Sequence, residues 1–105
     1  MATVVSTPTS EQAVVDAGSK VLTSDLSGLV GYGHVVDFPR ITISTLSEEH
    51  GCLNRVGPTG LSIGQKIRII PNHACVVRNM ADEVIFVRNE QGLTHQQVIA
   101  RGKVW

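Results

Sequence analysis

The chain has 105 residues, and its nine Lys and Arg residues are balanced by nine Asp and Glu residues, so its formal net charge at pH 7 is zero. This length suits one small domain spanning residues 1–105, and the balanced charge argues against a nucleic-acid-binding protein, which usually carries a basic patch. No apolar run approaches the roughly 18 residues of a membrane-spanning helix, and the N-terminus lacks the basic and apolar regions of a signal peptide. We therefore expect a soluble, cytoplasmic protein that binds neither nucleic acid nor membranes.

Short apolar runs led by β-branched residues alternate with Gly, Pro, Asn and Ser along the whole chain. This pattern predicts an all-β fold, a single barrel-like or sandwich-like domain of about eight short strands. Because no long segment keeps an apolar period of 3.6 residues, helices should be short turns at most, at 19–26 or 79–83. Turns are expected at 27–28, 57–60 and 89–92. The predicted strands are 3–7, 12–17, 33–37, 41–46, 66–70, 74–78, 84–89 and 94–100.

The two cysteines, Cys52 and Cys75, could form a disulfide by composition alone. Without a secretory signal, a reducing cytosol is the expected environment, and free or metal-bound thiols are favoured over a bridge.

His73 and Cys75 stand two positions apart after Ile70-Pro71-Asn72. In an extended strand such residues share one face, from which an imidazole and a thiolate can reach one Zn²⁺ and leave coordination positions open for a substrate. An unbroken strand would place both on its apolar, inward face, whereas a bulge at Pro71 would turn them toward a rim. The alternative is structural, with a buried imidazole bonded to a backbone carbonyl and a small core cysteine.

Two further clusters contain candidate catalytic residues. In Ser47-Glu48-Glu49-His50-Gly51, the Glu48 carboxylate could orient the His50 imidazole for acid–base chemistry, or the segment could be a solvated turn. Tyr32 lies between two glycines, so its phenol could be presented to a ligand, or its ring could pack on the core at a hairpin entry.

Five short motifs follow one another along the chain. They are Val14-Val15-Asp16-Ala17-Gly18-Ser19-Lys20, Gly31-Tyr32-Gly33, Glu49-His50-Gly51, Pro71-Asn72-His73-Ala74-Cys75 and Arg101-Gly102. From about Ala2 to Lys103 the chain resembles the C-terminal domain of the D-serine dehydratase and D-threonine aldolase family. The Pro-Asn-His-x-Cys motif with Glu-His-Gly upstream is the most specific part. One departure is Phe38-Pro39, where the family pattern has His-Pro.

The resemblance implies a pyridoxal-phosphate enzyme of the alanine-racemase-like fold type. In such enzymes an N-terminal α/β barrel carries the cofactor lysine, and the C-terminal β-domain contributes a divalent metal site that is usually completed in a homodimer. His73 and Cys75 are then the metal ligands, for zinc in the dehydratase branch or for another divalent ion; the aldolase branch tends to carry Asp at the second position. The implied reaction on a β-hydroxy D-amino acid is elimination of ammonia or carbon–carbon cleavage.

A barrel cannot fit into 105 residues beside this β-domain, and none of Lys20, Lys66 and Lys103 corresponds to the cofactor lysine. We therefore expect the metal-carrying part of a lyase, inactive alone, that needs a barrel domain or subunit as its partner. Its docking surface should be apolar and should favour a homodimer or other self-association. The alternatives are a stand-alone β-domain that binds a metal or a partner without catalysis, and a purely structural domain.

Overall fold

The structure is a computed structural model that describes residues 1–88 and 92–103. Nine strands and two short helices occur in these ranges, which confirms the predicted all-β class with only short helical turns. In chain order the elements are β1 (Ala2–Thr9), β2 (Gln12–Val15), α1 (Ser19–Leu22), β3 (His34–Val35), β4 (Thr42–Leu46), β5 (Gly51–Asn54), β6 (Lys66–Ile67), β7 (Ile69–Ile70), α2 (Ala74–Asn79), β8 (Glu83–Arg88) and β9 (Gly92–Gln97).

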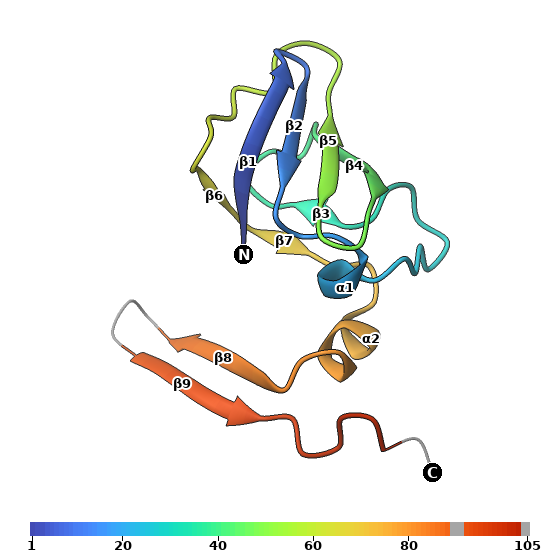
Figure 1. Cartoon of the computed structure of the whole chain (residues 1–105), viewed down its shortest axis with the longest axis vertical. Helices are drawn as coiled ribbons and strands as arrows, with labels where there is room; N and C mark the ends of the chain where they lie inside the picture. Colours follow the sequence, from blue (N-terminus) through green and yellow to red (C-terminus); the bar gives the residue numbers. More distant parts are fainter. Residues whose placement is uncertain (89–91, 104–105) are drawn as a thin grey trace.

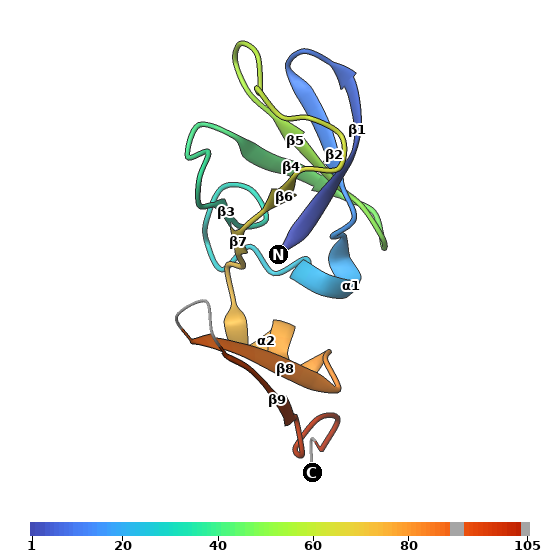
Figure 2. The same ribbon diagram turned by 90° about the vertical axis from the view of Figure 1, so that its left-hand side faces the viewer.

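Seven of the strands form one sheet in the order β6-β1-β2-β5-β4-β3-β7. At its two ends, β6 pairs with β1 and β7 pairs with β3, both antiparallel. Only Arg68 separates β6 from β7 in the sequence, so one extended segment connects both ends of the sheet. The result is the nearly closed, barrel-like body in the upper half of Figure 1 and Figure 2. The strand predicted at 66–70 is therefore present as the two short strands that close this barrel.

The hydrophobic core lies inside the barrel. In β5, Leu53 is fully buried between half-buried neighbours, the alternation expected when one face of an antiparallel sheet is covered. All buried apolar residues of the described chain precede α2, so α2 and the strands after it lie outside this core. The core residues are Ala2, Val4, Ala13, Val15, Ala17, Leu22, Val35, Ile41, Ile43, Leu53, Leu61 and Ile67.

The strand predicted at 74–78 is wrong, because the segment forms the helix α2. The helical turn predicted at 79–83 is wrong too, since α2 ends at Asn79 and β8 begins at Glu83. Val76 and Val77 favour a strand by propensity, but the chain leaves the barrel after β7, and residues 74–79 pair with no strand of the described residues. A helix instead satisfies the backbone hydrogen bonds within the segment itself.

Other differences are shifts of boundaries and one missed strand. β5 was not predicted, and the strand predicted at 33–37 is reduced to the two residues of β3. β9 begins and ends earlier than the predicted 94–100. The turn predicted at 89–92 lies outside the described residues except for Gly92.

The strands β8 and β9 form a separate antiparallel hairpin, paired from Glu83↔Gln97 to Arg88↔Gly92. In Figure 1 and Figure 2 this hairpin projects away from the barrel, with α2 between the two. Large apolar side chains of the hairpin are exposed, among them Phe86 and Leu93, at 52% and 69% of their surface. Neither helix of the described chain has the length and apolar character needed to cross a membrane.

Asp16 and Thr3 join the start of β1 to the end of β2. Thr3 N–H donates to the Asp16 carboxylate over 2.6 Å, and Asp16 N–H donates to Thr3 O over 3.1 Å. The first of these hydrogen bonds is the main cause of an Asp16 pKa below its ordinary value. A carboxyl group with a depressed pKa in the folded chain stabilises the fold above its unfolded pKa, and this contribution is lost as the pH falls through the folded pKa.

We therefore expect Asp16→Asn to lower the free energy of unfolding at neutral pH by less than about 1 kcal/mol, because the carboxylate is exposed. In acid, where the wild-type carboxyl group is protonated, the difference between the two proteins should vanish. Urea titrations at neutral and acidic pH measure this. A difference that does not change with pH would show that the charge of Asp16 has no part in stability.

Candidate metal centre

His73 is held by a carboxylate rather than by a backbone carbonyl. Its Nδ1 atom lies 2.6 Å from Oδ2 of Asp25, and both side chains are about 40% exposed, at 41% and 38%. An ionised carboxylate can only accept hydrogen bonds, so Nδ1 of the neutral imidazole carries the proton. The lone pair on Nε2 is therefore free to bind a metal ion.

The Asp25 carboxylate is itself fixed in place. Its Oδ1 atom accepts a hydrogen bond from Ser27 N–H at 2.9 Å, and the backbone N–H of Asp25 donates to Oγ1 of Thr23 at 3.2 Å. The hydrogen bond from His73, followed by that from Ser27, holds the pKa of Asp25 below its ordinary value. Asp25 therefore stays ionised at neutral pH, in the form that accepts the imidazole N–H.

Asn72, next to His73, ties this segment to the loop that contains Asp25. Its side-chain amide donates to the backbone carbonyls of Asp25, Leu26 and Gly31, at 3.4, 3.2 and 2.8 Å. The closing segment of the barrel and the loop after α1 are thereby joined directly beside the predicted metal ligand.

Cys75 is a free, exposed cysteine in the first turn of α2. It lines a shallow hollow of about 310 Å³ between α2 and the segment 97–100. Of the two orientations considered for an extended strand, the inward one is not found, because His73 is half-exposed and Cys75 exposed. Their common strand face is absent too, since His73 is the extended residue before α2 and Cys75 belongs to the helix. The structural alternative of a buried imidazole and a core cysteine fails for the same reason.

The donor set suits zinc. An imidazole nitrogen and a thiolate sulfur are common zinc ligands, and neither is typical of magnesium or calcium sites. No group of three or more His, Cys, Asp or Glu residues that could hold an ion occurs in residues 1–88 and 92–103. A site that used His73 and Cys75 would therefore be open and would need further ligands from a substrate, water or a second domain.

The other two candidates lie elsewhere on the barrel. His50 is exposed in the turn between β4 and β5, where its N–H donates to Oγ of Ser47 at 3.1 Å. Tyr32 is half-buried and packs against the core, and it directly follows Gly31, whose carbonyl accepts from Asn72. No side-chain hydrogen bond joins either residue to His73 or Cys75 in the described chain, and their catalytic roles stay predictions.

Asp25 and the anchoring role of Asn72 were not predicted. Asp25 lies 48 residues before His73, and only barrel closure brings the two together. Asn72 belongs to the Pro-Asn-His-x-Cys motif, and this position beside His73 is the one feature of the sequence that could have indicated its role.

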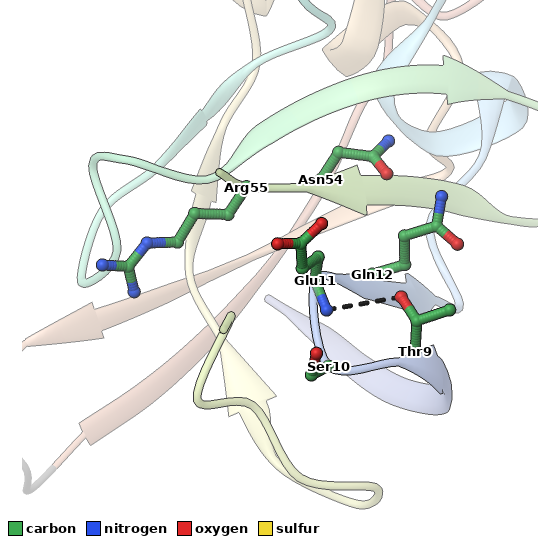
Figure 3. A pocket seen from close by; sticks show the side chains of 6 residues that line it. All are labelled: Thr9, Ser10, Glu11, Gln12, Asn54 and Arg55. Carbon is green, nitrogen blue, oxygen red and sulfur yellow. Dashed lines mark hydrogen bonds between the residues drawn. The ribbon is translucent and has the colours of Figure 1, made fainter. Parts of the chain in front are cut away.

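A second hollow, of about 350 Å³, lies at the β1–β2 turn, at the far end of the barrel from α2 (Figure 1). Figure 3 shows that the Arg55 side chain extends away from the side chains of this turn, and its guanidinium donates to the Pro58 carbonyl at 2.8 Å. None of the predicted site residues lines this hollow. The hollow is lined by Thr9, Ser10, Glu11, Gln12, Asn54 and Arg55 (Figure 3).

Comparison with known proteins extends these observations. The family model described as "Putative serine dehydratase domain" matches residues 1–87. An uncharacterized protein of Mycobacterium tuberculosis, Rv1414, is 37% identical over 92 residues, which are 86% of this chain and 69% of that protein.

Two solved enzyme structures share the fold. The D-threonine aldolase of Filomicrobium marinum superposes with a TM-score of 0.84 and 37% identity, over 99% of this chain. The D-threo-3-hydroxyaspartate dehydratase of Delftia sp. HT23 gives a TM-score of 0.77 at 24% identity, over 91% of this chain. The chain spans 28% of the aldolase and 30% of the dehydratase. It belongs to the serine dehydratase domain family.

Proposed function

We propose that this chain is the metal-carrying C-terminal β-domain of a pyridoxal-phosphate-dependent lyase that acts on β-hydroxy D-amino acids. The observation that carries the proposal is the arrangement at the start of α2, where the Nε2 lone pair of His73 is free and the Cys75 thiol is exposed. The Delftia dehydratase supports it, because a metal-free cysteine-to-alanine mutant and a histidine-to-alanine mutant of that enzyme are described. The two mutated residues are two positions apart, as His73 and Cys75 are.

In this function, zinc would supply Lewis-acid stabilisation of the departing β-hydroxyl group, and pyridoxal phosphate on the missing barrel would acidify the α-carbon. The residues of this chain have a narrower task. His73 and Cys75 bind and locate the ion, and Asn72 fixes the segment that carries them. Both reactions would use the same ion, so these two ligands alone do not choose between elimination and carbon–carbon cleavage.

The missing partner is a cofactor-binding barrel, as a domain of the same polypeptide or as a separate subunit. The chain spans less than a third of the aldolase and the dehydratase, so each has ample further sequence for such a domain. The β8–β9 hairpin offers the docking surface, because its apolar side chains are exposed and a two-stranded hairpin is only marginally stable by itself. We further propose that the assembly is a cytoplasmic homodimer.

A second candidate function is a stand-alone domain that binds a metal or a partner without catalysis. The observation in its favour is the length of the Mycobacterium tuberculosis relative, of which 92 aligned residues make up 69%. That relative is far too short to contain an α/β barrel, which typically needs about 250 residues.

The chain alone should release no pyruvate from D-serine when pyridoxal phosphate and zinc are added, because it lacks the cofactor lysine. Grafted in place of the matching 28% of the Filomicrobium marinum aldolase, it should give a lyase that depends on an added divalent metal. His73→Ala in the graft should reduce turnover at least about 100-fold, and Asp37→Asn, at the exposed ion pair with Arg68, should not.

Three outcomes decide between the candidates. Pyruvate above background from the isolated chain would refute its inactivity. A folded graft whose activity is indifferent to metal removal and to His73→Ala would refute the metal-carrying role. A folded graft without activity that still binds zinc would favour the stand-alone domain.

A further inference from the structure

The contact between Asp25 and His73 fixes the position of both side chains, although it contributes little to the stability of the fold. Both side chains are roughly 40% exposed, at 38% and 41%, and exposed ion pairs of that kind typically contribute little to stability. Nevertheless, the two carboxylate oxygens are committed to different donors, Ser27 N–H and His73 Nδ1. The arrangement therefore specifies the direction of the imidazole ring more than it stabilises the fold.

The backbone around Asp25 has an unusual conformation. Thr23 and Ser27, two residues before and after it, have φ values of 63° and 49°, and they are the non-glycine residues with positive φ in the described chain. For the β-branched Thr23 this is a clear outlier, and such conformations persist only when the surroundings enforce them. The loop that contains these residues is held by the three hydrogen bonds that Asn72 donates to the carbonyls of Asp25, Leu26 and Gly31.

The consequence for His73 follows from its two ring nitrogens. A proton held on Nδ1 by the carboxylate leaves Nε2 as the metal-binding atom, and rotation of the ring would break the 2.6 Å hydrogen bond. In metal centres, a carboxylate bonded to the second nitrogen of a histidine ligand fixes its tautomer and orientation and increases its basicity.

We propose that Asp25 is the positioning residue of the metal centre, which holds His73 in the Nδ1–H tautomer and directs its Nε2 toward the ion. The inference rests on the proposed function only insofar as His73 binds a metal. It assigns a role to a residue that lies far from the metal-binding motif in sequence, on the loop that follows α1.

The test uses the full chain with Asp25→Ala and Asp25→Asn. Zinc affinity, measured by competition with a chromophoric chelator, should fall about 10- to 100-fold in the alanine variant. It should fall less in the asparagine variant, whose amide oxygen can still accept the Nδ1–H bond but carries no charge. Nitrogen-15 NMR of the metal-free proteins should show the Nδ1–H tautomer of His73 in wild type and a mixture of tautomers in the alanine variant.

Asp37→Asn is the matched control, because Asp37 is also an exposed, ion-paired carboxylate but contacts Arg68. It should leave both the affinity and the His73 tautomer unchanged. Urea titrations of each variant show whether the fold persists, and the asparagine variant carries the test if the alanine variant unfolds. Wild-type zinc affinity and tautomer in both Asp25 variants would overturn the inference and leave the proposed function standing. A wild-type protein that binds no zinc would overturn both.

Discussion

Wild-type protein purified in the presence of zinc should contain about one zinc ion per chain, and His73→Ala and Cys75→Ala should each lose it. His73 and Cys75 are the two protein ligands proposed for an open site, so removal of either leaves a single weak contact. The zinc affinity should fall by more than about 100-fold, beyond the range typical for loss of an outer-shell residue. Elemental analysis gives the stoichiometry, and chelator competition gives the change in affinity.

The chain contains a matched control for each ligand. His95 is also an exposed histidine beside a carboxylate, with Nδ1 3.4 Å from Oε1 of Glu83, so His95→Ala tests whether any such histidine binds zinc. Cys52 is the other free cysteine, half-buried in β5. Both control variants should keep the bound zinc. A metal-free wild type, or equal losses in His73→Ala and His95→Ala, would remove the basis of the proposed function.

The barrel was largely predictable because its strands are locally encoded. The strands that contain Ile67 and Leu53 show where this local information is sufficient and where it is not. The strand containing Ile67 was found through its β-branched, alternating pattern, whereas β5 around Leu53 was missed because a charged turn and a glycine precede it. The failure at α2 has a different cause, since Val76 and Val77 do have strand propensity. The helix forms there because no strand of residues 1–88 and 92–103 lies beside the segment to pair with it, which is a tertiary property.

The candidate site also has a part that the sequence predicts and a part that only the fold reveals. His73 and Cys75 are close in sequence, so their spacing and their motif identify them without a structure. Asp25 is brought to His73 only because β7 closes the barrel against β3, and no local pattern could predict that contact. The sequence therefore indicates which atoms could bind a metal, and the fold supplies the group that orients them.

Gly18→Ala should be among the most destabilising substitutions in the chain, because Gly18 lies directly against the β4–β5 turn. A Cβ atom there would overlap the backbone carbonyl oxygens of Ser47 and Glu48. These same oxygens accept the N–H groups of Ser19 and Lys20, at 2.8 and 3.1 Å, and so hold the start of α1 on the barrel. The methyl group can be accommodated only if those two hydrogen bonds lengthen or break.

We expect the free energy of unfolding of Gly18→Ala to fall by about 3 kcal/mol, at the upper end of the range for an overpacked site. Gly92→Ala is the control, since its added methyl group would meet open space, and its urea midpoint should barely change. Because α1 leads into the loop that carries Asp25, the Gly18 variant should also bind zinc more weakly while it is still folded. A Gly18 variant with wild-type stability and zinc affinity would show that the placement of α1 on the β4–β5 turn does not determine the position of Asp25.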